Sequence, residues 1–252
     1  LVPPLIANGA ILAARLRIPD FTSWTATNLT MGAGEVAFSA GFHLNVDGDL
    51  TLAPGARLHL HAAPTNHPDT CGAGLNVGGD LHISEDAWIY PHAEWTNGAV
   101  VEIVADGDVT IAPGGGIDAD GAGWTPVSNN GNGPGAGQDN ASGGGYGGRG
   151  GGPHGGAVYG SARLPLLPGS PAGWYCYSAG LRAGQGGGAI RLLAGGEVHL
   201  DGILSANAMP PEPSYGGCGA GGGAVFVSCA RMTGQGTLRA NGSLNYNRAG
   251  AD

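Results

Sequence analysis

Apolar and polar residues alternate in short runs along most of this chain. Leu44 and Val46 flank one polar residue, Leu50 and Leu52 flank another, and similar runs recur downstream. Alternation over a few residues predicts a β-strand with one buried face. Most runs end at Gly, Asp-Gly or Pro-Gly, which are typical of tight corners. No stretch shows a convincing helical period, so the pattern predicts an all-β protein.

The runs belong to an internal repeat. Two segments read LNVDGDLTLAPG and LNVGGDLHISED, and their apolar and corner positions recur three more times. Three of the intervals suit one coil of three short strands, whose apolar face is buried only when coils stack. The interval of 89 residues fits one coil with an insertion of about 55 to 60 residues. The copies lie 31, 28, 89 and 35 residues apart and begin at Leu44, Leu75, Ile103, Leu192 and Val227.

This repeat predicts a right-handed parallel β-helix, or β-solenoid, of about five coils with one long Gly-rich inserted loop. An antiparallel sandwich also uses many short strands, but it does not explain corners that recur at fixed offsets. We expect residues 1–30 to form an N-terminal segment with an edge or partner-pairing strand. Residues 31–121 form coils, 122–185 form the inserted loop, and 186–252 form further coils and a C-terminal tail.

Composition favours a folded chain with neither nucleic acid nor membrane as a partner. The 52 glycines and 17 prolines of 252 residues would suit low complexity, but 42% of the residues are hydrophobic, which argues against disorder. The ten basic residues are all Arg, the net charge is −9, and no basic patch is evident. No apolar stretch is long enough to span a bilayer.

The cysteines favour an extracellular protein. They form no C-x-x-C pair, so their spacing does not predict a zinc or redox site. Disulfides fit better, although Cys229 lies in an apolar run and is also interpretable as a buried thiol. The disulfide candidates are Cys71, Cys176, Cys218 and Cys229.

Two Gly-rich runs lead directly into strands and then reach a small Ala-Asn turn. Residues 186–190 are followed by Ala206 and Asn207, and residues 221–225 by Ala240 and Asn241. These segments resemble the right-handed parallel β-helix repeats, of the pectin-lyase-like kind, of secreted bacterial surface proteins. The resemblance covers residues 30–120 and 186–243, and it implies an extracellular or cell-surface location. That group includes polysaccharide lyases, hydrolases, adhesins and fibre-forming proteins, so the fold leaves the function open.

The first functional hypothesis is a structural one. The turn sequence near the N-terminus repeats the Ala-Asn-Gly turn of the coils, and neither end shows an evident cap. Open parallel edges favour head-to-tail stacking of copies into a filament, appendage or adhesin without chemistry of its own. Loops that cover the edges are the alternative. The expected pairing residues are Leu5, Ala7, Asn8 and Gly9 at one end, with Leu238 and Asn241 at the other.

The second hypothesis is a polysaccharide lyase, a glycoside hydrolase or a glycan-binding module that uses the inserted loop. Aromatic rings there could grip a sugar chain, or could hold the loop to the solenoid or to another subunit. They are Trp124, Tyr146, Tyr159, Trp174, Tyr175 and Tyr177. Glycoside hydrolysis needs two carboxyl groups at a defined separation. If the protein is an enzyme, the catalytic candidates are Asp118, Asp120, Asp139, Arg149 and Arg163.

Polar residues also recur in register. Stacked coils would bring Asp49, Asp80 and Asp108 into one column with Glu197, where carboxylates are candidate Ca²⁺ ligands. Aspartate also serves tight turns through its short side chain, which explains the column without an ion. His82 and His199 share an outward register, as expected for a solvated ladder rather than a metal site. We expect no other cofactor.

Overall fold

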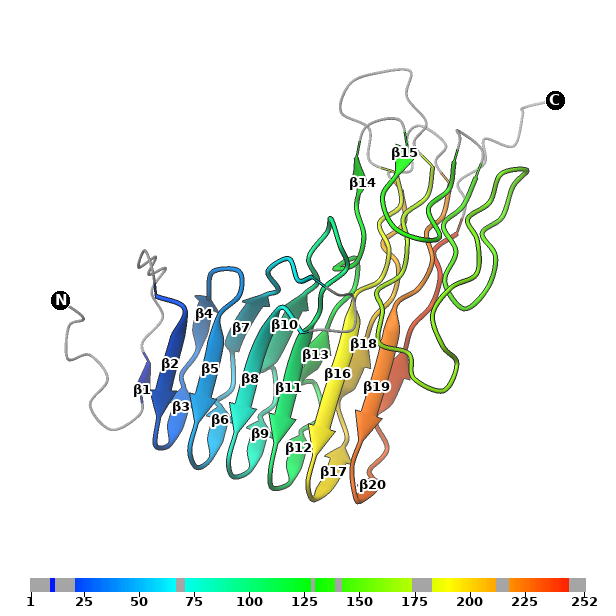
Figure 1. Cartoon of the computed structure of the whole chain (residues 1–252). Coiled ribbons are helices and arrows are strands. Elements are labelled where there is room, and N and C mark those ends of the chain that lie inside the picture. The colour runs from blue at the N-terminus through cyan, green and yellow to red at the C-terminus, as the bar shows by residue number, and fades with distance from the viewer. Residues whose placement is uncertain are drawn as a thin grey trace.

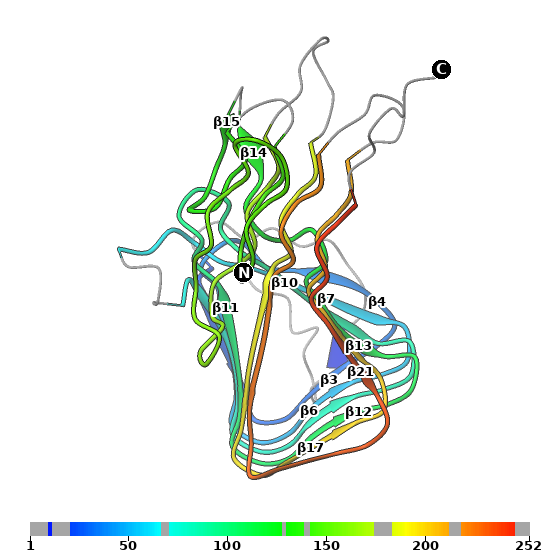
Figure 2. The same cartoon turned by 90° about the vertical axis from the view of Figure 1, so that its right-hand side faces the viewer.

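The computed structural model describes residues 10–11, 21–66, 71–127, 130–138, 142–173, 183–211 and 218–244. In these residues no helix occurs, and all but two of the strands belong to three parallel sheets. The sheets form three sides of a prism along which the coils stack from the N-terminal to the C-terminal end (Figures 1 and 2). The predicted all-β parallel β-helix is therefore confirmed, and the antiparallel sandwich is excluded.

Each coil contributes one strand to each sheet. Sheet A contains β1 (Ala10–Ile11), β3 (Leu29–Met31), β6 (Leu50–Leu52), β9 (Leu81–Ile83), β12 (Val109–Ile111), β17 (Glu197–Leu200) and β20 (Arg231–Thr233). Sheet B contains β2 (Ser23–Ala26), β5 (His43–Val46), β8 (Ala73–Val77), β11 (Val101–Ala105), β16 (Ala189–Ala194) and β19 (Ala224–Ser228). Sheet C contains β4 (Gly34–Ala37), β7 (Ala56–His61), β10 (Trp88–His92), β13 (Gly116–Asp118), β18 (Ile203–Ser205) and β21 (Thr237–Arg239).

These strands make six three-stranded coils, one more than the sequence repeat indicates. The additional coil is the first, β2 to β4, and it begins inside the segment that we expected at residues 1–30. Between the other coils, corner residues in contact are 31, 28 and 89 positions apart, as the repeat predicts. The first coil is offset from the second by only 21 positions at the contact between Asn28 and Asp49. A search for intervals near 30 residues therefore misses it.

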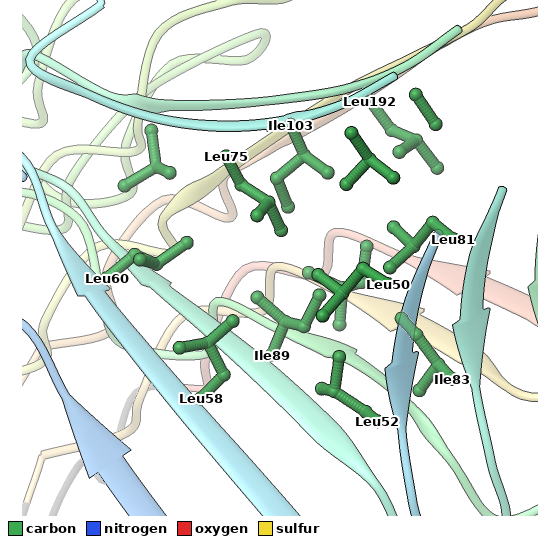
Figure 3. Packing of buried hydrophobic residues seen from close by; sticks show 14 of the residues in the cluster. Leu50, Leu52, Leu58, Leu60, Leu75, Leu81, Ile83, Ile89, Ile103 and Leu192 are labelled. Atoms are coloured by element: carbon green, nitrogen blue, oxygen red, sulfur yellow. The ribbon is translucent and has the colours of Figure 1, made fainter. Parts of the chain in front are cut away.

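The inward-facing residues form one continuous apolar core. In sheet B, Leu44, Leu75, Ile103 and Leu192 pair in register from coil to coil, and each is 0% exposed. Leucine and isoleucine side chains from sheets A and C fill the space from the other two sides (Figure 3). Because burying one such side chain is worth about 1.5–3 kcal/mol, stacking of like columns supplies much of the stability.

The inserted segment between β13 and β16 is an ordered bundle of extended segments rather than a loose loop. After the antiparallel hairpin of β14 (Pro126–Val127) and β15 (Asn130–Gly131), its segments lie side by side beyond one edge of the solenoid (Figures 1 and 2). Backbone hydrogen bonds join them without regular strands, for example from Gly145 N to Gly135 O at 2.7 Å and from Gly156 N to Gly143 O at 2.9 Å.

Segments from the last two coils complete this glycine bundle, which we define as residues 132–138, 142–173, 183–188 and 218–223. The Gly169 N–H bonds to Gly187 O at 2.7 Å, and the Gly187 N–H bonds to Gly221 O at 3.1 Å. A Cβ atom on Gly156 would lie 1.7 Å from Gly135 O, and one on Gly186 would lie 1.8 Å from Gly169 O. The segments approach so closely that only glycine fits, which accounts for much of the unusual composition.

Candidate functional site

The outer face of sheet C gathers aromatic and titratable side chains from three successive coils. In register, His59 lies beside Tyr90, and His61 lies beside His92. Trp88 pairs with Gly116 in the next coil, where a Cβ atom would lie 2.7 Å from the Trp88 ring. We call this surface the sheet C patch and define it by His59, His61, Trp88, Tyr90, His92 and Asp118.

The rings of the patch stand side by side, each stacked on its neighbour. The centroid distance is 4.5 Å between His59 and Tyr90 and 4.3 Å between His61 and His92, and the planes are within 10° of parallel. The two stacks are joined by a contact of 3.1 Å between His59 Nδ1 and His92 Nε2. Stacking thus covers ring faces, and one nitrogen of His59 faces one nitrogen of His92.

Burial controls the protonation of the patch. Burial lowers the pKa of His92 to about 4, and the neighbouring His61 and His59 lower it further. Burial also lowers the pKa of His59, against the opposing effect of Glu35, whose Oε1 lies 3.8 Å from His59 Nε2. The pKa of His61 is lowered for the same reasons, burial first and then His59. All three imidazoles are therefore neutral at pH 7.

Two of the three aspartates predicted as catalytic candidates, Asp118 and Asp120, lie at the end of the patch. They differ in their hydrogen bonds. Asp118 Oδ1 accepts the Asp120 N–H at 2.8 Å, and burial raises the pKa of Asp118. Asp120 is fully occupied, because Oδ1 accepts from Ser205 Oγ and Asn207 N, both at 2.6 Å, and Oδ2 accepts from Asn207 Nδ2 at 3.0 Å. Asp120 thus fastens one coil to the next.

The other catalytic candidates are not gathered around these aspartates. Arg149 is exposed at an open groove of about 560 Å³ in the glycine bundle, lined mainly by glycine backbone and Tyr146. Arg163 is exposed in a turn, where its backbone N–H donates a hydrogen bond to Ser161 Oγ at 3.2 Å. Asp139 lies outside the described residues. The polysaccharide-active function stays a prediction that no observed constellation supports.

The described aromatic rings of the insertion are packed within it. Trp124 is 7% exposed and covers Gly98 and Gly133, where a Cβ atom would lie 2.4 Å and 2.7 Å from its ring. The Tyr159 hydroxyl donates to Pro168 O at 2.5 Å, and the ring of Tyr146 meets that of Tyr159 edge-on at 5.0 Å. Tyr146 and Tyr159 thus contact each other within the insertion, and Trp124 joins it to Gly98 of the solenoid. Trp174, Tyr175 and Tyr177 lie outside the described residues.

The predicted aspartate column exists and is a hydrogen-bonded ladder. Asp49 Oδ1 accepts the Asp80 N–H at 2.8 Å, Asp80 Oδ1 accepts the Asp108 N–H at 2.7 Å, and Asp108 Oδ1 accepts the Glu197 N–H at 2.7 Å. The amide oxygen of Asn28 begins the ladder by accepting the Asp49 N–H at 2.9 Å. An amide oxygen fills the same role at Asn28, so these hydrogen bonds do not require a carboxylate. No metal-binding group of three or more ligand side chains occurs in the described residues.

Two of the four cysteines are free thiols in the described residues. These are Cys71 and Cys229, of which Cys229 packs against the core. The disulfide pairing stays a prediction. Cys176 lies outside the described residues, and Cys218 is half-buried. Within the described part of the chain, no helix is long and apolar enough to cross a membrane.

The C-terminal coil leaves core positions uncovered by the described residues. Met232 follows the fully buried Val198 in its column, and Leu238 follows the fully buried Leu204, yet they are 42% and 48% exposed. Leu238 and Asn241 were expected to pair with another copy, and Leu238 lies on this surface. Leu5, Ala7, Asn8 and Gly9 lie outside the described residues, so that side of the predicted pairing is not seen.

Sequence reasoning missed the sheet C patch, although a signal for it was present. The repeat aligns RLHLHA in one coil with WIYPHA in the next, which already places the histidine and tyrosine rings in shared columns. The candidate sites were instead sought among acidic residues and in the aromatic-rich insertion. Comparisons of the chain with protein families, with curated proteins and with solved structures give no match.

Proposed function

We propose that this protein is a structural β-solenoid whose copies stack end to end, C-terminal coil against N-terminal coil, in a filament, appendage or adhesin outside the cytoplasm. The observation that carries the proposal is the half exposure of Met232 and Leu238 at core positions of the last coil. An apolar coil end that presents unpaired strand edges binds another parallel coil, which extends all three sheets.

A second copy is the occupant that fits this end best. The single charged residue of the first coil, residues 21–41, is Glu35. The charged residues of the last coil, residues 224–244, are Arg231 and Arg239, so the charges of the two ends are opposite. These ends lie at opposite extremes of the stack (Figure 1). Stacking in register would bring Leu238 beside Val36 and Arg239 beside Ala37, two positions along from Glu35. In sheet A the edge of β3 is already paired with β1, so a stacked copy extends this sheet by taking the place of β1 or by pairing beyond it.

The extracellular location rests on the resemblance of the Gly-rich repeats to those of secreted β-helix proteins. A low content of charged residues, 12%, and the absence of Lys suit a surface protein but do not identify one. The glycine bundle lies beyond one edge of the stack and reaches past its C-terminal coil, so a stacked copy would also lie close to the bundle (Figure 1).

Light scattering over a concentration series, followed by negative-stain electron microscopy, tests the proposal. We expect concentration-dependent fibres whose axial repeat matches one subunit, and we expect Leu238→Asp to abolish them. The matched control is Leu164→Asp, because Leu164 is 50% exposed but lies in the glycine bundle. Arg239→Glu is expected to weaken the fibres, and Glu35→Arg in the same chain to restore them.

A monomer at every concentration, or fibres that persist in Leu238→Asp, would overturn the proposal. Either result would mean that copies do not associate through the exposed core positions of the last coil.

A further inference from the structure

Two imidazole nitrogens in the sheet C patch face each other across a short gap. His59 Nδ1 and His92 Nε2 are 3.1 Å apart, the ring planes are within 10° of parallel, and the ring centroids are 5.4 Å apart. The contact therefore needs a proton on one nitrogen and a lone pair on the other. Transfer of that proton to the other nitrogen of its own ring leaves two lone pairs facing each other across the gap.

This separation is close to that of two imidazole ligands on one metal ion. Zn–N bonds of about 2.05 Å at a tetrahedral angle place two nitrogens roughly 3.3 Å apart. We propose that His59 and His92, together with His61, bind a late first-row divalent transition ion, of which Cu²⁺ binds imidazole most tightly. Neutral imidazole suits Cu, Ni and Zn, and affinity for such sites peaks at Cu²⁺.

A third ligand is available on the same strand. His61 is two residues from His59, so both side chains leave the same face of β7, and its ring lies 4.3 Å from that of His92. As the rings lie in the structure, no three ligand side chains of the described residues converge on one point. The facing nitrogens of His59 and His92 lie along one line, so both rings must tilt before their lone pairs meet at one ion. The His61 ring must turn as well to complete a three-imidazole set, a donor set that zinc sites use with water in the remaining position.

The surroundings support metal binding in two further ways. Glu35 Oε1 lies 3.8 Å from His59 Nε2, which places a carboxylate behind the ligand so that Nδ1 faces the site. The side chain of His59 is 21% exposed, so an ion has access from solvent while the site keeps open positions for water.

The matched control is another outward histidine on the same solenoid. His199 already uses both ring nitrogens, with Nδ1 2.8 Å from Thr233 Oγ1 and Nε2 3.0 Å from Asp201 Oδ2. His199→Gln removes an imidazole that is 45% exposed, against 21% for His59, and is expected to leave metal binding unchanged.

The experiment titrates the whole protein, with its cysteines alkylated, with CuCl₂ and follows binding by calorimetry and electron paramagnetic resonance. We expect one ion per chain with a nitrogen-coupled signal. His59→Gln and His92→Gln should each weaken binding about tenfold or more, and His61→Gln should weaken it less. Thermal melts without metal establish that each variant folds.

Binding that survives in the His59→Gln, His92→Gln double variant would overturn the proposal, as would an equal loss in His199→Gln or no binding by the unmodified sequence. If the variants fail to fold, a protection experiment on the unsubstituted protein tests the proposal. Bound Zn²⁺ is expected to protect His59 and His92, but not His199, from acylation by diethyl pyrocarbonate, and equal labelling with and without Zn²⁺ would overturn it.

Discussion

Neighbouring segments are held together by packed apolar side chains in the solenoid, and by direct backbone contact without side chains in the glycine bundle. In the solenoid, side chains such as Leu75 fill the space between three sheets and are 0% exposed. In the bundle, segments lie so close that a Cβ atom on Gly156 would come within 1.7 Å of Gly135 O. Removing atoms should therefore damage the first region, and adding atoms should damage the second.

The largest effect is expected from loss of volume in the solenoid. Leu75→Ala should lower the free energy of unfolding by about 2–5 kcal/mol, because it removes buried methyl groups and leaves a cavity. Urea denaturation followed by circular dichroism measures the change. His82→Ala is the control, because His82 is exposed and adjoins the buried Leu81 on the same strand. Equal effects of the two changes would contradict the assigned inward and outward faces.

Gain of a single methyl group should destabilise the bundle. Gly156→Ala should cost about 1–3 kcal/mol or more, because the new Cβ atom meets a backbone carbonyl that cannot move alone. Hydrogen exchange should show loss of protection in the bundle while the solenoid amides stay protected. Gly147→Ala is the matched control, since a Cβ atom there meets nothing within 4 Å. If Gly156→Ala behaves like Gly147→Ala, the bundle is not packed through its backbone.

The stability of the aspartate column should fall when a hydrogen-bond acceptor is removed, but not when only a charge is removed. Asp80→Ala leaves the Asp108 N–H without its 2.7 Å partner and should cost on the order of 1 kcal/mol. Asp80→Asn should be nearly neutral, because Asn28 already fills the same role with an amide oxygen. Added CaCl₂ should not change the melting temperature. A calcium-dependent rise that Asp80→Asn removes would instead show an ion in the ladder.

Acid should weaken the solenoid through the sheet C patch. His92 has a pKa of about 4 in the folded chain against an ordinary value of 6.5. Between pH 4 and 6.5 the unfolded chain binds more protons than the folded chain. The contribution of His92 to the free energy of unfolding is therefore fully present above about pH 6.5 and is lost as the pH falls toward 4. After allowance for the partial exposure of the ring, the loss is on the order of 1 kcal/mol. Denaturation in EDTA-containing buffers at pH 5 and 7.5 measures it.

His92→Gln should flatten this pH dependence. The raised pKa of Asp118 acts in the opposite direction, because it favours the folded state as the pH falls. An unchanged slope in His92→Gln would mean that His92 is not the buried base that the geometry indicates.

Much of the solenoid follows from local patterns that any coil repeats. The intervals of 31, 28 and 89 residues reappear as contacts between coils, and the aspartate column forms as the alignment requires. The alignment of His61 with His92 was also readable, although their stacking was not. Prediction failed for the first coil because its offset of 21 residues departs from the common interval.

The glycine bundle was beyond prediction for a physical reason. A run of glycines has no apolar and polar faces, so its sequence does not indicate which segments will pair. The partners are set by hydrogen bonds between residues as distant as Gly187 and Gly221, or Gly144 and Gly219. The burial of Trp124 over Gly98 and Gly133 likewise depends on where these segments come together.

The sequence by itself determined the all-β class, the parallel stacking, the inward columns and the carboxylate corners, because each depends on residues within one coil and on its repetition. Only the tertiary structure decided the number of coils, the order within the insertion, the full bonding of Asp120 and the meeting of His59 with His92. Those features depend on distances between side chains or backbones of different coils, and no local pattern records such distances.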